Sequence, residues 1–227
     1  KVTSDGLAIL KLVKPGGAYL DQIARLAQTL QTAAETPPVR ISSTEPIISD
    51  VLVPALPAFF QANPDTRLDL DVSLEVSNLN IGEADIAVRM YRSEQLDIVT
   101  RHLGDLELGL FASRSYLERT GMPKTFQEVW TRDLVGYDQS DLLLRGMRDY
   151  GLDAQRDWFA TRCDHHAVYW ELVRAGCGIG VAQSCMARHD PDIVHLFPEV
   201  PLPTLPVWLA AHETLRTTPR IRRVWDA

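Results

Sequence analysis

Residues 163–166 read Cys-Asp-His-His, a run of side chains that can bind a metal ion or transfer a proton. Zinc needs three or four ligands at characteristic spacings, and no second pair follows at such a spacing, so His189 and His195 contribute only if the fold brings them close. The simpler interpretation is that Asp164 or His165 begins a helix. Because polar groups at a helix N-terminus favour an anion, we expect an anion-binding position here and no metal.

A second motif lies just downstream, where residues 173–184 read VRAGCGIGVAQS. A dinucleotide-binding loop requires a strand, then glycines, then a helix whose N-terminus faces the pyrophosphate. Here the predicted helix comes first and the strand last. The order predicts that Gly176 ends the helix in the left-handed conformation and that Gly178 and Gly180 allow close packing on a sheet. We therefore expect no nucleotide and no other cofactor at this run.

Catalytic nucleophiles have little support in the sequence. Ser43, Ser113 and Ser184 lack the flanking glycines of a nucleophile elbow. Cys177 and Cys185 are either a redox switch or small buried residues, and we expect the latter because few basic neighbours are close enough in sequence to lower a thiol pKa. An odd, sparse set of three cysteines is typical of a reducing cytoplasm. We expect a cytoplasmic protein that is not an enzyme; only the adjacent histidines favour an enzyme as an alternative.

Composition and charge narrow the functional classes. The 227 residues are 45% hydrophobic and 23% charged, as in ordinary globular proteins, and their formal net charge is −7. So acidic a surface repels phosphate backbones, which argues against nucleic-acid binding by these residues unaided. No apolar run approaches the roughly 18 residues of a membrane span.

Arg89 ends a predicted buried strand, where α/β folds place ligand contacts, although a surface salt bridge explains it equally well.

The elements that must position these residues begin with a helix predicted over about residues 7–34. Apolar residues recur at helical spacing along one face of residues 19–34. Pro15-Gly16-Gly17 should kink this helix and Pro37-Pro38 should end it. Nothing ahead of the main domain covers the apolar stripe, so the same helix of a second copy is the expected cover. The stripe predicts a homodimer or homotetramer.

From residue 39 onward, strands alternate with helices, which predicts an α/β fold with a largely parallel sheet. The expected first helix is capped by Ser43 or Thr44 and runs to about Gln61, with Pro46 in its first turn. Further helices are expected at 115–120, 166–175 and 219–226. Strands are expected at 39–42, 68–72, 84–89, 134–137, 179–181, 194–196 and 207–211, with a strand pair within 103–112.

These elements, in this order, resemble the LysR-type transcriptional regulators. Residues 2–10 (VTSDGLAIL) resemble the end of that family's DNA-binding wing and the start of its linker helix. Residues 39–42, followed by a helix led by Ser and Thr, resemble the start of its effector domain. The most specific match is residues 82–89 (GEADIAVR); residues 103–104, 110–113 and 173–181 complete the pattern.

The resemblance implies two Rossmann-like lobes joined by two crossover strands, as in periplasmic solute-binding proteins, preceded by an N-terminal linker helix. Residues 1–38 would be the linker and dimerisation helix, behind a winged helix-turn-helix that would lie upstream. Residues 39–227 would be the effector-binding domain, with lobe one at 39–112 and 206–227 and lobe two at 113–205.

The resemblance also implies a small-molecule effector in the cleft between the lobes. By position, the walls of this cleft would include Ser43, Thr44, Arg89, Tyr137, His165 and His166. Two helix N-termini would converge there, which suits a small anion such as a carboxylate. The effector would shift the geometry of the oligomer and hence the DNA binding of the upstream head. The alternative is a transporter's solute-binding protein, which shares the fold but, as a monomer, has no use for an exposed apolar stripe.

Overall fold

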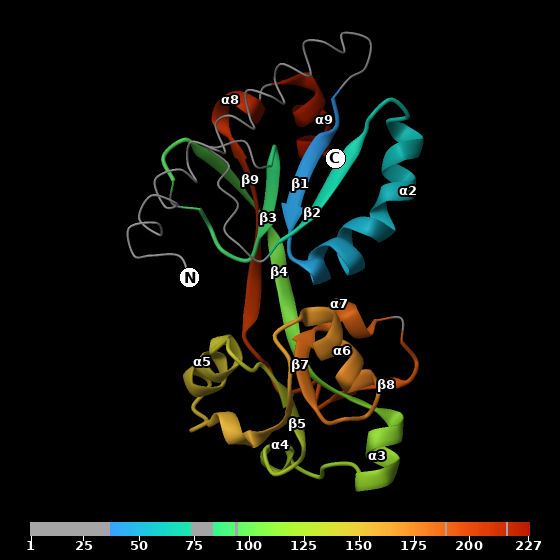
Figure 1. Ribbon diagram of the computed structural model, residues 1–227, viewed down its shortest axis with the longest axis vertical. Helices are drawn as coiled ribbons and strands as arrows, with labels where there is room; N and C mark the ends of the chain where they lie inside the picture. Colours follow the sequence, from blue (N-terminus) through green and yellow to red (C-terminus); the bar gives the residue numbers. More distant parts are fainter. Residues whose placement is uncertain (1–36, 74–83, 94, 189, 217) are drawn as a thin grey trace, which may run out of the picture. The chain divides into compact units, whose positions relative to one another are not determined.

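The computed structural model describes residues 37–73, 84–93, 95–188, 190–216 and 218–227 (Figure 1). These residues form two compact units. The first contains the described residues up to Ile48, together with those of Leu52–Leu103 and Val207–Ala227. The second contains Ser49–Val51 and the described residues of Gly104–Pro206. The linker helix expected over residues 7–34 lies outside the described residues.

The first unit is built on β1 (Val39–Ser43), which lies between two parallel neighbours, β2 (Leu68–Val72) and β3 (Ile86–Arg89). On its other side, β3 pairs antiparallel with β9 (Thr204–His212). All four residues of β3 are buried, as expected from its run of apolar residues. The sheet is therefore mixed, and the expectation of a largely parallel sheet is wrong because β9 returns into it from the second unit.

The helix predicted after β1 forms, with an irregularity that the sequence analysis missed. Helical backbone begins at Glu45, directly after Thr44, whose carbonyl oxygen accepts the N–H of Ile48 at 3.1 Å. The turn η1 (Ile47–Leu52) is a π-helix, and α2 (Val53–Ala62) continues it. Pro54 and Pro57 have no N–H to donate, so the regular hydrogen-bond ladder is interrupted there.

The C-terminal helices complete the first unit. They are α8 (Glu213–Arg216) and α9 (Pro219–Asp226), the latter with the bounds expected from the sequence. Arg220 of α9 donates to the carbonyl oxygen of Pro38 at 2.9 Å and pairs with Asp85 at 3.1 Å. These contacts fix α9 at the beginning of β1 and beside the residue that precedes β3.

The second unit is an α/β layer structure around β4 (Ile98–Ser113). This strand pairs antiparallel with β7 (Gly180–Gln183) and with β8 (Ile193–Leu196). Next to them, β5 (Leu134–Gly136) pairs parallel with β6 (Phe159–Arg162), and Leu134 bridges to Ile179. The helical segments are α3 (Arg114–Thr120), α4 (Phe126–Val129), α5 (Leu142–Asp149), η3 (Arg156–Trp158), α6 (His166–Arg174) and α7 (Ser184–Ala187).

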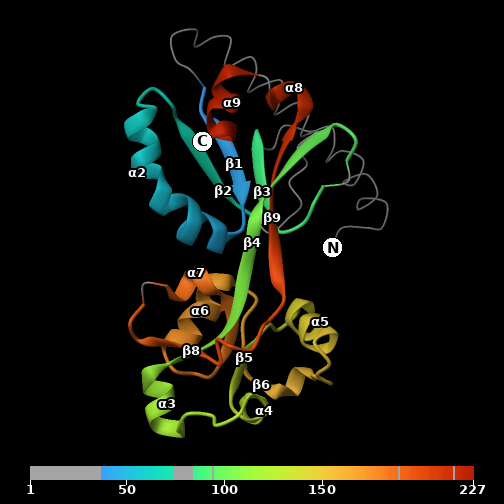
Figure 2. The same ribbon diagram turned by 180° about the vertical axis from the view of Figure 1, so that it is seen from behind.

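Alternating residues of the strands in this unit build two separate cores. Leu110 and Leu134 belong to a cluster with residues of α3, α4 and α5, whereas Phe111 and Val135 belong to a cluster with residues of α6. Successive residues of a strand point to opposite faces of a sheet, which explains the division. Helix α6 packs on β5 and β7, as the two opposite views show (Figures 1 and 2).

The chain passes between the units inside two strands, β4 and β9. The strand pair expected within residues 103–112 is wrong, because the residues form part of one 16-residue strand. Gly104 adopts a φ of +147° within this strand, a backbone conformation that glycine tolerates better than other residues.

The glycine run behaves as its helix-to-strand order predicts. Gly176 has a φ of +83° and follows α6. The N–H of Gly176 bonds the carbonyl oxygen of Val173 and the N–H of Cys177 bonds that of Leu172, which together make a Schellman motif. A Cβ on Gly178 would lie 2.5 Å from the carbonyl oxygen of Asp133, so close packing excludes a side chain. The run is a helix end.

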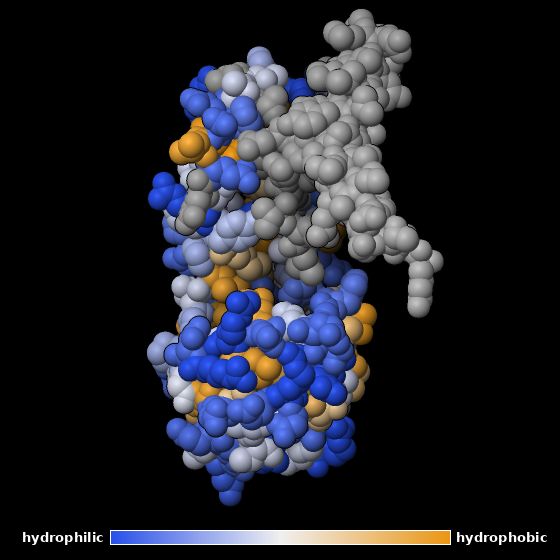
Figure 3. All heavy atoms as spheres, turned by 60° about the vertical axis from the view of Figure 1, so that its left-hand side comes forward, coloured by the Kyte–Doolittle hydropathy of each residue, from blue (hydrophilic) through white to orange (hydrophobic). Residues whose placement is uncertain are grey.

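The outer surface of the second unit is mostly hydrophilic on the face where α5 comes forward, with small hydrophobic areas between polar residues (Figure 3). The large exposed hydrophobic side chains among the described residues of this unit are Val51, Met122, Leu142, Tyr150 and Val168. Among the helices that the structure describes, none is long and apolar enough to cross a membrane.

Candidate functional site

The predicted site residues of the first unit gather where β1 and β3 end. Because these strands are parallel, their carboxyl ends meet at one edge of the sheet. Ser43, the last residue of β1, is fully buried, and its Oγ donates to the carbonyl oxygen of Val88 at 2.9 Å. Arg89, the last residue of β3, is 7% exposed. Ser43 and Arg89 are thus the last residues of two adjacent parallel strands.

The guanidinium of Arg89 links the ends of β1 and β3 by hydrogen bonds. It donates to the carbonyl oxygens of Ser42 at 2.7 Å and Val88 at 3.0 Å, and to Oγ of Ser42 at 2.9 Å. Ser42 in turn donates to Oδ2 of Asp71 at 2.9 Å, and Arg40 bonds Oδ1 of the same carboxylate at 3.0 Å. Burial lowers the pKa of Arg89. The side chain is part of a buried network and is not the surface salt bridge that the sequence left open.

Thr44 presents a different kind of polar atom. Its Oγ1 is buried and has no hydrogen-bond partner among the residues that the structure describes. The residue directly precedes the helical segment that starts at Glu45, but its side chain does not cap that helix. A buried hydroxyl without a partner costs free energy, so Thr44 is a candidate for contact with a ligand.

The predicted site residues of the second unit lie where β5 ends and α6 begins. Tyr137 directly follows β5, His165 is the N-cap residue of α6 and His166 is its first residue. Oη of Tyr137 lies 3.4 Å from Nδ1 of His166, and the ring centroids are 5.6 Å apart. The hydrogen bond runs in either direction, according to the tautomer of the imidazole.

Burial raises the pKa values of both tyrosines at this edge. It raises the pKa of Tyr137 to about 12, and the nearby Asp164 carboxylate adds to the effect. The ring of Tyr169 lies 5.2 Å from that of Tyr137. Oη of Tyr169 donates to the carbonyl oxygen of Val181 at 3.0 Å and accepts its N–H at 2.9 Å, and burial raises the pKa of Tyr169 as well. Tyr137 is therefore a protonated phenol that lies between His166 and the buried, hydrogen-bonded Tyr169.

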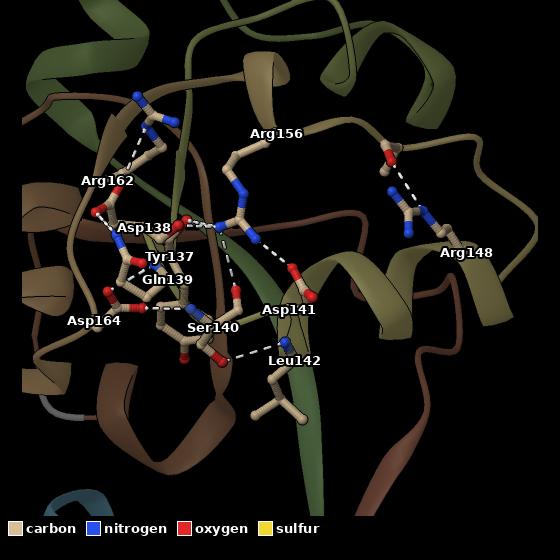
Figure 4. Close-up of polar contacts among 11 residues, drawn as sticks. Tyr137, Asp138, Gln139, Ser140, Asp141, Leu142, Arg148, Arg156, Arg162 and Asp164 are labelled. Carbon is tan, nitrogen blue, oxygen red and sulfur yellow. Dashed lines mark hydrogen bonds and ion pairs between the residues drawn. The ribbon is translucent and has the colours of Figure 1, made fainter. Parts of the chain in front are cut away.

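Asp164 does not begin α6, although the sequence analysis offered it as one of two choices. Its two carboxylate oxygens accept the backbone N–H groups of Gln139 and Ser140 at 2.9 and 3.0 Å (Figure 4). These two hydrogen bonds lower the pKa of Asp164. His165 is the residue that precedes the helix, and its side chain makes no capping bond.

The metal and redox alternatives receive no support from the geometry. Within the described parts of the chain, no group of three or more His, Cys, Asp or Glu side chains is arranged to hold a metal ion. Cys163, Cys177 and Cys185 are free thiols. Burial raises the pKa of Cys185, which disfavours the reactive thiolate.

Sequence reasoning missed the residues that support the site. Ser42 and Asp71 connect Arg89 to Arg40, and Arg156 holds the segment after Tyr137. The alternating Leu-Asp-Leu-Asp-Val pattern of β2 did signal that Asp71 shares one face of that strand with Asp69. No local pattern marks Arg156, because its partners lie 15 to 19 residues away.

Comparison with known proteins agrees with this fold. The family model for the LysR substrate binding domain matches residues 32–227. The transcriptional regulator CrgA of Neisseria meningitidis serogroup C (strain 8013) is 27% identical over 195 residues, which cover 80% of this chain and 64% of that protein. The chain thus spans just under two thirds of the length of this relative, which is described as an HTH-type regulator.

Two solved structures share the fold. The regulatory domain of CrgA from Neisseria meningitidis superposes with a TM-score of 0.74 at 22% identity, covering 84% of this chain and 96% of that one. The effector-binding domain of AmpR from Citrobacter freundii gives a TM-score of 0.68 at 17% identity, with the same coverage of 84% and 96%. These likenesses confirm the expected two-lobed α/β fold with two crossover strands.

Proposed function

The chain belongs to the LysR family of transcriptional regulators, of which it forms the regulatory, effector-binding domain, and we propose that this domain senses a small anionic molecule, such as a carboxylate. Thr44, Tyr137, His165 and His166 contact the ligand in this proposal, and Ser43 and Arg89 support it through the backbone. The relatives favour a regulator over the alternative of a transporter's solute-binding protein.

The observation that carries the proposal is the pairing of Tyr137 with His166 at the first turn of α6. The N-terminus of a helix carries partial positive charge and N–H groups that favour an anion. A protonated phenol and an imidazole beside it add polar hydrogens of the kind that orient a carboxylate. Thr44, with its buried hydroxyl, supplies a comparable polar atom in the first unit.

In the proposed mechanism, ligand binding changes the geometry of an oligomer and so the DNA binding of a head encoded upstream. A ligand shifts such an equilibrium only by its difference in affinity for the two states. The oligomer is a homodimer or homotetramer working in the cytoplasm, and the domain itself catalyses no reaction. The acidic charge of −7 fits a domain that leaves DNA contact to another part of the protein.

A thermal-shift screen of small carboxylates and aromatic acids, followed by calorimetric titration, tests the proposal. A ligand present at about 100 times its Kd stabilises the folded state by roughly 2.7 kcal/mol. Tyr137→Phe, His166→Gln and Thr44→Val should reduce this stabilisation, whereas Tyr150→Phe, at an exposed position, should not. If every acid that shifts the wild type shifts the first three variants equally, these residues do not belong to the site.

A double-mutant cycle between the two units extends the test. Thr44→Val and His166→Gln should each weaken binding. A non-additive loss in the double variant indicates that one ligand molecule depends on both side chains. A strictly additive loss would show that Thr44 and His166 contribute independently to the binding free energy.

A further inference from the structure

We propose that Asp164 is a positioning residue, whose carboxylate fixes the loop of residues 137–141 (Figure 4) and thereby sets Tyr137 against His166. We call these five residues the clamped loop. The role rests on the proposed function, because it concerns the ligand only if Tyr137 and His166 contact it. Nothing in the sequence pattern assigns Asp164 this role.

The N–H side of the clamped loop is held by one carboxylate. Oδ2 of Asp164 accepts the N–H of Gln139 at 2.9 Å and Oδ1 accepts that of Ser140 at 3.0 Å. Hydrogen bonds to a charged acceptor are stronger than those between neutral groups. Both oxygens of Asp164 are thus directed at two successive peptide groups, which restricts their orientation as well as their position.

The carbonyl side of the same loop is held by a cation. The guanidinium of Arg156, from η3, donates to the carbonyl oxygens of Tyr137 at 3.1 Å and of Asp138, and pairs with the carboxylate of Asp141 (Figure 4). The backbone donors of the loop therefore meet an anion and its acceptors meet a cation. A loop held on both sides has few alternative conformations, which lowers the entropic cost of keeping a side chain in place.

The position of Asp164 in the chain connects this loop to α6. The N–H of Cys163 bonds the carbonyl oxygen of Gly136 at 2.9 Å and continues the β5–β6 ladder to the residue before Asp164. His166 follows Asp164 by two residues, and Tyr137 is the first residue of the clamped loop. Because the carboxylate links these two short segments, it determines the 3.4 Å separation between Oη of Tyr137 and Nδ1 of His166.

Amide hydrogen exchange measured by NMR tests the clamp without any ligand. In Asp164→Ala, exchange of the Gln139 and Ser140 amides should be at least about tenfold faster, and the nuclear Overhauser contact between the Tyr137 and His166 rings should weaken. Asp164→Asn retains one acceptor oxygen and should give an intermediate result. Asp153→Ala, which removes an exposed carboxylate of the same unit that accepts the side-chain amide of Gln155, is the matched control. Unchanged exchange and an unchanged ring contact in Asp164→Ala overturn the proposal.

Calorimetric titration with benzoate links the clamp to the site. Asp164→Ala should bind benzoate about tenfold more weakly than the wild type, and Asp153→Ala should bind it equally well. An Asp164→Ala variant with a released loop and unaltered affinity also overturns the positioning role. A wild type that binds neither benzoate nor any other acid refutes the proposed ligand class, while the exchange comparison still decides whether Asp164 places Tyr137.

Discussion

Oη of Tyr137 lies 3.4 Å from Nδ1 of His166, and the two rings are nearly perpendicular, with an interplanar angle of 80°. The residues are 29 positions apart in the chain. They meet because β5 and β6 are parallel, so that the loop after β5 and the chain that leads into α6 emerge at the same edge of the sheet. The contact between the two side chains is therefore a product of the sheet topology.

Tyr137 should make the stability of the protein depend on alkaline pH. Its pKa is about 12 in the folded chain, against an ordinary value of 10.0. The folded state therefore keeps a proton that the unfolded state loses, so the free energy of unfolding is unaffected below about pH 10 and falls as the pH rises towards 12. Between pH 9 and pH 11 the contribution of Tyr137 to this fall should be about 1 kcal/mol.

Urea denaturation of the wild type and of Tyr137→Phe at both pH values measures that contribution. Other tyrosines and lysines titrate in the same range, so the comparison between the two proteins is the informative quantity. The loss of stability should be smaller in Tyr137→Phe. Equal losses would show that the phenol is solvated in the folded protein.

Arg89→Lys should destabilise the first unit although the charge is kept. The guanidinium makes three hydrogen bonds to Ser42 and Val88, and an ammonium cannot reproduce that planar fork. We expect a loss of about 2 kcal/mol or more in the free energy of unfolding, because buried acceptors lose a charged donor. Arg145→Lys, on the exposed side of α5, should change stability by less than about 0.5 kcal/mol. Chemical denaturation of both variants checks the difference.

The order of the main elements was predictable from the sequence, because it depends on local periodicity. The buried strand that ends in Arg89, the helix from His166 and the helix end at Gly176 all follow from apolar spacing and glycine chemistry. The long strand β4 was not predictable in this way. Its length depends on pairing with β7 and β8, which begin far downstream at Gly180 and Ile193.

The candidate site was predictable in its residue types but not in its connections. Tyr137 and His166 follow from their positions at element ends, whereas the contact between them depends on the parallel pairing of β5 and β6. Asp164 or His165 was expected to start a helix, and Asp is the more usual cap, yet His165 precedes α6. Two peptide N–H groups, those of Gln139 and Ser140, lie 25 and 24 residues earlier and bind the Asp164 carboxylate instead.

Gly104→Ala should destabilise the protein without creating a clash. A Cβ at this position meets no atom within 4 Å, but the φ of +147° is one that a residue with a side chain adopts only with strain. We expect a cost of about 1–3 kcal/mol. Gly146→Ala is the matched control, because its Cβ also meets nothing within 4 Å, and it lies inside α5, where alanine is the better helix former. That variant should be more stable than the wild type by up to about 1 kcal/mol. Thermal unfolding of the two variants should therefore shift in opposite directions.

Tyr169→Phe should separate stability from ligand binding. Oη of Tyr169 bonds both the N–H and the carbonyl oxygen of Val181, so its removal leaves two backbone groups of β7 without this partner. We expect a loss of about 1–3 kcal/mol in the free energy of unfolding. The aromatic ring remains, however, and with it the packing against Tyr137.

The affinity of Tyr169→Phe for any acid that binds the wild type should therefore change little at a temperature where the variant is folded. Tyr137→Phe, by contrast, should lose affinity with a smaller effect on stability at neutral pH. Calorimetric titration gives the affinity, and urea denaturation the free energy of unfolding, of each of the two variants. Parallel losses of stability and affinity in Tyr169→Phe would show that the two tyrosines act as one unit, and that the hydroxyl of Tyr137 has no separate role in binding.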